Sequence, residues 1–415
     1  MIEPMGEGGA RYGRGIQRRR GLRPGAFAFV LALGCFALSC GTAVAQPAAG
    51  AEGQGPVRAP EWDALFVRTI GWTGADGAAS VVLSPGRVLW LFGDTWIGPV
   101  RDNRHTEGSV MVNNTIAVHQ AEQMSEAPER AEFFWDESGI RPASWATPEQ
   151  PSEWFWPAGG GLVVRDGGEP RLLVFMTRLS RRDEPDSVWN FTCRGSTLLT
   201  IKNPDDDPSK WRVVQSTLTS IAAEAPLERT WGTAVVPDPE DAASLLVFGI
   251  DGTEPLNKRA LLARAPVSSV DRFETWSFRT ADGWSGVPGE AVSVSGNVAS
   301  EVSIHEISDR FSGKHFVMIY SEPPLGAGIM ARTALRPEGP WSEPVRLYEC
   351  PEPGLDPRNL VYSAKAHPHL SREGELLVSY CVNSTDFRHM AANADLYLPR
   401  FVRVPLAHLP VPFGE

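Results

Sequence analysis

The sequence predicts an all-β protein, and within that class a five-bladed β-propeller of four-stranded antiparallel blades. The 415 residues include 40 Gly, 35 Pro and 14 Trp, a composition that favours strands and turns over helices. After roughly the first forty residues, no long segment has sustained helical periodicity. Short apolar runs that follow turn sequences recur about every seventy residues, a spacing typical of propeller blades.

The first sixty residues are expected to lie outside the propeller. Six arginines precede the apolar run "AFAFVLALGCFAL", and the small-residue sequence "AVAQ" follows it. This order predicts a signal peptide over residues 1–45, cleaved after Ala45, and a secreted or periplasmic protein. Anchoring as a lipoprotein through Cys40 is the alternative, although "ALSC" lacks the usual aliphatic residue three places before the cysteine. Residues 46–60 are expected to form a linker, and residues 61–415 the propeller.

The strands of each expected blade can be assigned in chain order. Each second strand is a continuous apolar run, as in "VLWLFGDTWIG" (88–98), rather than an alternating one. Such a run indicates burial on both faces, which a blade packed between two neighbours provides. The fifth blade lacks an obvious outer strand, and residues 62–67 are the candidate for it. The expected first strands are residues 74–83, 156–164, 230–236, 300–307 and 362–370.

The expected topology brings polar residues of several blades to one face. In an antiparallel blade, the start of the first strand and the end of the second strand lie beside the central axis on the same side. The register of each hairpin can slip by one or two residues. The expected pairs are Asp76 with Thr95, Pro157 with Arg178, Arg229 with Asp251, Glu301 with Ser321, and Ser363 with Asn383.

Carboxylates beside aromatic side chains and a few cations are what hydrolysis of a glycosidic bond requires. One carboxyl group protonates the leaving oxygen, and another acts as base or nucleophile at the anomeric carbon. Each candidate also has a structural interpretation, as a turn cap, an ion-pair partner, or a core aromatic or histidine side chain. The candidate catalytic residues are Asp76, Asp94 and Glu301, and the candidate substrate-binding residues are Trp156, Arg178, Arg229, Trp231, Asp251, Glu322, His367 and Asn383.

Two groups of motifs resemble a known family. The segments "GADGAAS", "LWLFGDTWIG" and "NNTIAV", followed later by "SAKAHPHL" and "GELLVSY", are similar to the secreted bacterial propellers of domain of unknown function 4185. That family belongs to a broad five-bladed group with arabinanases, invertases and levansucrases, and some of its members are endo-D-arabinanases. The resemblance implies a propeller fold and activity on a furanose-containing polysaccharide.

The resemblance also implies roles for the acids. By position, Asp76 corresponds to the base or nucleophile of the wider group, and Glu301 to the general acid, with Glu228 and Glu322 as rivals. Asp94 or Asp251 corresponds to a third acid that orients the others. The first strand of the second blade carries no acid, which departs from the arabinanase pattern. No cofactor is expected, although arabinanase-type propellers often hold an axial calcium ion near a histidine, which would here be His367.

Charge and cysteine content restrict the partners. The formal charge is −11, and it becomes about −15 without residues 1–45, which disfavours nucleic acid and anionic membranes as partners. Cys193, Cys350 and Cys381 are expected to be buried thiols, and one disulfide among them stays open. We therefore expect a monomeric exported glycoside hydrolase that acts on an arabinan-like polysaccharide or oligosaccharide. A non-catalytic carbohydrate-binding propeller and a scaffold for protein contacts are the alternatives.

Overall fold

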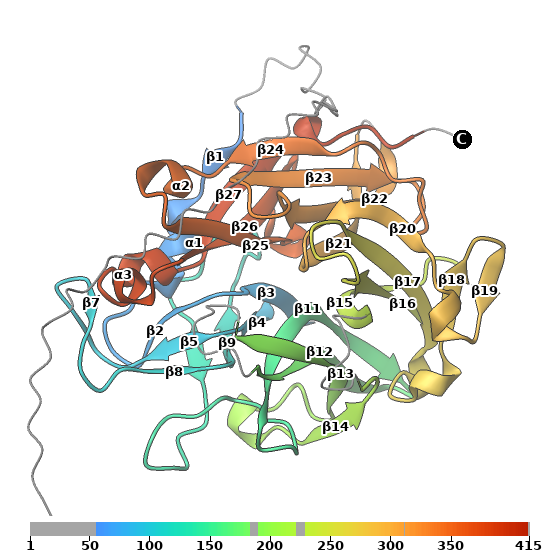
Figure 1. Cartoon of the computed structure of the whole chain (residues 1–415). Coiled ribbons are helices and arrows are strands. Elements are labelled where there is room, and N and C mark those ends of the chain that lie inside the picture. The colour runs from blue at the N-terminus through green and yellow to red at the C-terminus, as the bar shows by residue number, and fades with distance from the viewer. Residues whose placement is uncertain (1–54, 183–189, 221–228, 311, 414–415) are drawn as a thin grey trace, which may run out of the picture. The chain divides into compact units, whose positions relative to one another are not determined.

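The computed structural model describes residues 55–182, 190–220, 229–310 and 312–413, which belong to one compact unit, Val44–Glu415. The predicted signal peptide, Cys40, Glu228 and most of the predicted linker lie outside these residues. The described chain is mostly β, as the sequence predicts, with short helical segments only (Figure 1). None of its helices is long and apolar enough to cross a membrane. Cys193, Cys350 and Cys381 are free and buried, as expected for thiols in the core.

The strands form seven antiparallel sheets, five of which have four or more strands. In these five, consecutive strands of the chain are mostly neighbours, so each sheet is largely a meander. Their strands are β3 (Ala79–Ser84), β4 (Arg87–Phe92), β9 (Thr115–Gln120) and β10 (Glu132–Phe134); β11 (Glu153–Asp166), β12 (Glu169–Arg181), β13 (Phe191–Ile201) and β14 (Val213–Thr217); β15 (Arg229–Pro237), β16 (Ser244–Asp251), β17 (Lys258–Pro266), β18 (Ser277–Thr280), β19 (Gly283–Ser285) and β20 (Ser293–Val298); β21 (Val302–Asp309), β22 (Gly313–Ser321), β23 (Gly328–Ala334) and β24 (Val345–Glu349); and β25 (Asn359–Ala366), β26 (Glu375–Ser384), β27 (Arg400–Pro405) and β1 (Val57–Arg58).

Two small sheets complete the set. One contains β2 (Trp72–Ala75), β5 (Thr95–Ile97) and β8 (Val110–Val112), and the other pairs β6 (Val100–Arg101) with β7 (Arg104–His105). Because the described chain has seven sheets, and one of them has six strands, the predicted count of five four-stranded blades is not confirmed. The helices are α1 (Pro60–Asp63), α2 (Glu352–Leu355) and α3 (Phe387–Ala391), with 3₁₀ turns η1 (Ala64–Phe66), η2 (Pro208–Lys210), η3 (Val267–Ser269), η4 (Phe273–Thr275), η5 (Pro288–Glu290), η6 (Pro368–Leu370), η7 (Ala394–Tyr397) and η8 (Leu406–His408).

The outer strand of the last sheet differs from the prediction. Residues 62–67 are not a strand, because α1 and η1 cover residues 60–66. The strand is β1 instead, which pairs with β27 and lies within the predicted linker. Pro60 explains the difference, since proline is well suited to the first turn of a helix but cannot donate a hydrogen bond to a neighbouring strand. The helical turn buries Trp62 and Phe66 completely.

The first strands of the five larger sheets enclose a narrow cavity. Contacts run in chain order from β3 to β11, β15, β21 and β25. A hydrogen bond between Ser80 Oγ and His367 Nδ1 (2.6 Å) then connects β3 to the residue that follows β25. The enclosed space, which we call the inner-strand cavity, has a volume of about 30 Å³. It is lined by Ala79, Ser80, Gly159, Gly160, Gly161, Thr233, Ala234, Val235, Ser303, Ile304, His305, Lys365 and Ala366.

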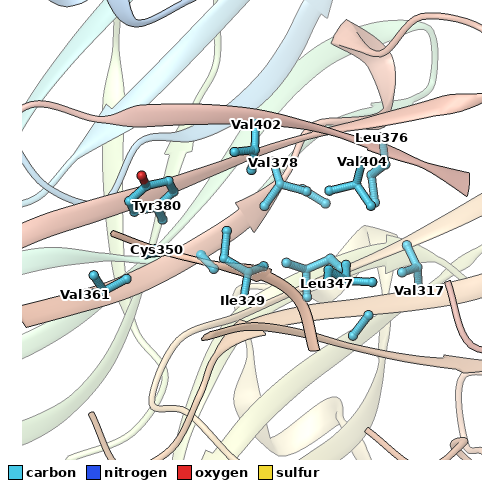
Figure 2. Packing of buried hydrophobic residues seen from close by; sticks show 14 of the residues in the cluster. Val317, Ile329, Leu347, Cys350, Val361, Leu376, Val378, Tyr380, Val402 and Val404 are labelled. Carbon is cyan, nitrogen blue, oxygen red and sulfur yellow. The ribbon is translucent and has the colours of Figure 1, made fainter. Parts of the chain in front are cut away.

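Buried side chains on both faces of the second strands hold the sheets together. In β16, Leu245 and Val247 pack into one hydrophobic cluster, whereas Leu246 and Phe248 pack into the next. The continuous apolar runs therefore lie between two cores, as the sequence predicts. Figure 2 shows one such core, in which side chains of β22–β24 and β25–β27 interdigitate. Complete burial of each such Val, Leu or Ile side chain contributes roughly 1.5–3 kcal/mol to folding.

Replacement of Gly160 by alanine tests the close approach of β11 and β15. A Cβ atom at residue 160 would overlap the carbonyl oxygen of Gly232. We expect Gly160→Ala to lower the free energy of unfolding by about 1–3 kcal/mol, measured by denaturant titration. Gly286→Ala is the control, because its Cβ would have no atom within 4 Å, and its effect should stay within about 0.5 kcal/mol. Equal effects of the two substitutions would contradict this packing.

Candidate functional site

Two aspartates on the two arms of one hairpin are held side by side by their backbones. Asp76 follows β2, and Asp94 follows β4. The Asp76 amide donates to the Asp94 carbonyl (3.2 Å), and the Gly93 amide donates to the Asp76 carbonyl (3.0 Å). The Asp76 carboxyl group occupies the place where a side chain at residue 93 would begin, so a Cβ there would overlap Asp76 Oδ1. Glycine at position 93 thus permits the contact between the two loops.

Tyrosine hydroxyl groups fix the Asp76 carboxyl group. Tyr362 from β25 donates to Asp76 Oδ2 at 2.5 Å, and Tyr397 from η7 donates to the same oxygen at 2.7 Å. Asn383 from β26 donates through Nδ2 to the Tyr362 hydroxyl oxygen (3.2 Å). Three segments of the last part of the chain therefore orient an acid that comes from the first part.

The Asp94 carboxyl group is fixed by two other donors. Trp156 Nε1 from β11 donates to Asp94 Oδ1 at 2.8 Å. Asn113 Nδ2, between β8 and β9, donates to the same oxygen at 3.1 Å. The Trp156 ring is partly exposed and stands edge-on to Phe191, with ring centroids 4.8 Å apart. An aromatic side chain thus borders the acid pair.

The surroundings raise the pKa of both acids. Burial, followed by the nearby Asp94 carboxylate, raises the pKa of Asp76 to about 8, against the opposing effect of the two tyrosine hydrogen bonds. Burial also raises the pKa of Asp94 to about 6, although hydrogen bonds from Trp156 and Asn113 favour its ionised form. The two groups titrate together, so between these pH values the pair carries one proton. Both residues remain partly exposed at the surface.

Glu301 lies near the aspartate pair, and Lys365 lies near Glu301. Glu301 directly precedes β21, and its charge contributes to the raised pKa of Asp76. Burial lowers the pKa of Lys365, whereas the Glu301 carboxylate acts to raise it. Glu301 Oε2 and Lys365 Nζ are both buried without a hydrogen-bond partner among the described residues. Asp76, Asp94, Glu301, Trp156 and Asn383 of the predicted site are therefore close to one another.

The other predicted charged residues form separate ion pairs. Arg229 lies opposite Asp251, as the hairpin predicts, and its Nε atom is 3.4 Å from Asp251 Oδ2. Burial acts to raise the pKa of Asp251, but Thr253 hydrogen bonds and the arginine charges outweigh it, so the pKa is lowered. Glu322 forms an ion pair with Arg346 at 2.5 Å. These contacts match the structural alternative of an ion pair.

Arg178 likewise contacts residues in and next to its own sheet. Its guanidinium group lies 3.3 Å from Glu153 Oε2 and donates to the carbonyl oxygens of Arg194 and Thr219. The register differs from the prediction, because Phe155 and not Pro157 lies opposite Arg178. A β-bulge between Pro157 and Gly161 accounts for the shift of two residues.

Trp231 and His367 lie in the core rather than at a ligand-binding face. Trp231 is 2% exposed and packs against Phe273, Trp276 and Phe278, so its ring faces are covered. His367 is fully buried, and its Nδ1 and Nε2 atoms bond to the hydroxyl groups of Ser80 (2.6 Å) and Ser379 (2.8 Å). Both placements match the structural interpretation, a core aromatic and a hydrogen-bonded core histidine side chain.

The surroundings of His367 do not fit the axial calcium ion that arabinanase-type propellers often hold. Calcium prefers six to eight oxygen ligands, many of them carboxylates. Both ring nitrogens of His367 are already bonded to serine hydroxyl groups. The described residues contain no group of three or more His, Cys, Asp or Glu side chains arranged to hold a metal ion.

Sequence reasoning missed the tyrosines and Asn113. Tyr362 could have been found, because it opens the expected first strand of the last blade. Its partner Asn383 was predicted, but Asn383 lies opposite Leu360, three residues from the expected Ser363. Ser363 has a positive φ of 55° at a bulge, which accounts for one residue of this difference. Tyr397 lies in a 3₁₀ turn between strands, where no periodic pattern indicates its position.

The chain belongs to the family described as domain of unknown function (DUF5005), which matches residues 60–406. Membership of domain of unknown function 4185, which the motifs resemble, is not confirmed by this match. No curated protein matches the sequence.

Several solved structures are similar to the chain. A protein from Bacteroides ovatus, described as a candidate hydrolase, has a TM-score of 0.66 and 17% identity, with 87% of this chain and 94% of that chain covered. An α-L-arabinofuranosidase from Lactobacillus brevis has a TM-score of 0.47 and 12% identity, with 86% and 100% covered. The catalytic domain of a GH62 α-L-arabinofuranosidase from Coprinopsis cinerea has a TM-score of 0.41 and 12% identity, with 81% and 98% covered. The similarity to the Bacteroides protein shows a shared fold and no more.

Removal of the Tyr397 hydroxyl group tests the hydrogen bonds to Asp76. A donated hydrogen bond favours the ionised carboxylate, so its loss in Tyr397→Phe should raise the pKa of Asp76 further above about 8. The expected rise is about one unit, measured by NMR titration of the side-chain carboxyl carbon. Tyr320→Phe is the control, because the Tyr320 hydroxyl group contacts Arg332 and not the acid pair. A pKa that stays the same in Tyr397→Phe would show that this hydrogen bond is not formed in solution.

Buried histidines near the inner strands predict sensitivity to acid. His119 is 2% exposed, its Nδ1 atom accepts from Trp90 Nε1 (2.8 Å), and burial lowers its pKa to about 4. Burial also lowers the pKa of His305 to about 4 and that of His369 to about 3. The folded state keeps these rings neutral, whereas the unfolded state binds their protons below about pH 6.5. Their contribution to stability is therefore present above pH 6.5 and is lost as the pH falls towards 4.

Replacement of His119 by glutamine isolates one such group. The wild-type free energy of unfolding should fall between about pH 7 and pH 4.5, with about 2–3 kcal/mol of the fall due to His119. His119→Gln can still accept from Trp90 but does not titrate, so its fall should be smaller by that amount. Denaturant unfolding at the two pH values measures the difference. Parallel pH profiles for both proteins would contradict a neutral, buried His119.

Proposed function

We propose that the protein is an exported glycoside hydrolase that cleaves a furanose-containing, arabinan-like polysaccharide with the Asp76–Asp94 pair and Glu301. One observation supports this most strongly: two partly exposed carboxyl groups, set side by side by backbone hydrogen bonds, have pKa values raised to about 8 and about 6. Environments that separate the pKa values of two neighbouring acids are typical of acid–base catalysis.

The pKa order suggests how the roles divide. Asp76 has the higher pKa, so it holds the shared proton near neutral pH and acts as the acid that protonates the leaving oxygen. Asp94 accepts two hydrogen bonds on Oδ1 and has the lower pKa, so it acts as base or nucleophile at the anomeric carbon. Glu301 is the third acid, and its charge helps to keep the proton on Asp76. This division reverses the role that position alone suggested for Asp76.

We propose that the five larger sheets are propeller blades, because their first strands contact one another in chain order around the inner-strand cavity. The partly exposed Trp156 beside Asp94 is suited to stack on a sugar ring. The furanose class rests on the resemblance of the "FGDT" segment to the family 4185 propellers, to which we propose a distant relationship. The predicted signal peptide supports export to the periplasm or the medium, and we propose that the exported protein is a monomer.

A carbohydrate-binding propeller without catalysis is the second candidate. The Trp156 ring beside Asp94, with the Trp154 ring centroid 6.4 Å from it, supports it equally well. A binding protein would retain sugar after loss of either acid, whereas hydrolysis requires both.

Incubation of the purified mature protein with a panel of arabinan, arabinogalactan, arabinoxylan and levan tests the proposal. Release of reducing sugar from at least one of them is expected. Asp76→Asn and Asp94→Asn should each reduce the rate at least about 100-fold, because each removes a proton-transfer or nucleophilic group. Asp251→Asn is the matched control, since Asp251 also ends a second strand but pairs with Arg229 and Arg259, and it should stay within a few-fold of wild type.

The outcomes separate the candidates. Slower migration of the protein in a gel that contains one of these polysaccharides, without release of reducing sugar, would favour the binding protein. Hydrolysis that survives both Asp76→Asn and Asp94→Asn would exclude this pair as the catalytic site.

A further inference from the structure

We propose that the inner-strand cavity binds one small monovalent anion, such as chloride, through the ammonium group of Lys365. This site is distinct from the Asp76–Asp94 pair, and the inference does not depend on the proposed hydrolase activity. It rests on the burial of Lys365, on the position of its nearest acid, and on the groups that line the cavity.

Lys365 has a buried ammonium group that the described residues leave unsatisfied. The residue is 3% exposed, lines the cavity from β25, and has no hydrogen-bond partner for Nζ among the described residues. Gly159 makes room for it, since a Cβ at that position would lie 3.0 Å from Nζ. An ammonium group has three donors and no acceptor, and its burial without partners costs several kcal/mol. A group that accepts hydrogen bonds and carries negative charge would remove this cost.

The nearest acid does not fill this role. The Glu301 carboxylate acts on Lys365 through its charge, but the two side chains form no ion pair within 4.0 Å. Glu301 Oε2 is itself without a partner, and Glu301 is not among the residues that line the cavity. The side of the ammonium group that faces the cavity therefore has no counter-charge from the protein.

The lining of the cavity favours an anion over a cation. No carboxyl group is among its lining residues. The Ser303 hydroxyl group accepts from the Ala366 amide (2.8 Å), which leaves its own hydrogen available for donation. Burial lowers the pKa of the neighbouring His305 to about 4, so its ring is neutral near pH 7 and Lys365 is the lining residue that can carry a charge there. The volume of about 30 Å³ is enough for one monatomic ion or about two water molecules.

Halide binding can be measured on the intact mature protein. At about 0.1 M salt and equal ionic strength, chloride should raise the melting temperature of wild type by about 2 °C or more relative to gluconate, because gluconate is too large to enter. Lys365→Met should lose this difference, since methionine fills similar space without charge. Lys258→Met is the matched control: Lys258 also faces Glu301, but it bonds to Ser300 and does not line the cavity, so the difference should persist.

A second measurement does not depend on any variant. Wild-type crystals soaked in bromide should give an anomalous scattering peak beside Lys365 Nζ. Equal melting temperatures of wild type in chloride and gluconate, with no bromide peak in the cavity, would show that water alone fills it and would overturn the inference. A chloride effect that Lys365→Met retains would also overturn it.

Discussion

The contact between the Asp76 carboxyl group and the backbone of Gly93 is the constraint on which the candidate site depends. Because residue 93 has no side chain, the loop after β2 can lie directly against the loop after β4, where two backbone hydrogen bonds hold it. The contact places Asp76 next to Asp94, where the surrounding protein covers most of both carboxyl groups. Two carboxyl groups in such surroundings cannot both ionise easily, so the site retains a proton near neutral pH.

Residues on the first strands of the larger sheets also contact this pair, so the site includes distant parts of the chain. Trp156 reaches Asp94 from β11, and Tyr362 reaches Asp76 from β25. Each contact crosses from one sheet to another, so the geometry of the acids depends on the packing of whole sheets. The inner strands also enclose polar groups, including Lys365 and His305, that a purely apolar core would exclude. The protein thus combines apolar cores between the sheets with a polar interior at their inner edges.

The sequence predicts the strands well, because a strand that is buried on both faces has a continuous apolar run. Continuous apolar runs such as 244–252 indicated strands between two cores, and β16 has that position. Simple hairpin folding also placed Arg229 opposite Asp251 and, through the pairing of Val302 with Tyr320, Glu301 opposite Ser321. It failed at Pro157–Gly161, where a bulge shifts the register by two residues, and at Tyr362–Lys365, where a bulge accounts for part of the shift, because a bulge has no clear sequence signal. The tertiary contacts of Tyr397 and the burial of Trp231 and His367 depend on packing that one-dimensional patterns do not contain.

The shared proton is the property that distinguishes a catalytic acid pair from two ordinary turn aspartates. Site-specific NMR titration of the Asp76 and Asp94 carboxyl carbons in the wild-type protein measures it directly. Two coupled steps are expected, with the upper one near pH 8 and the lower one near pH 6. Independent titration of both carboxyl groups near pH 4, as in exposed aspartates, would contradict a proton-sharing site.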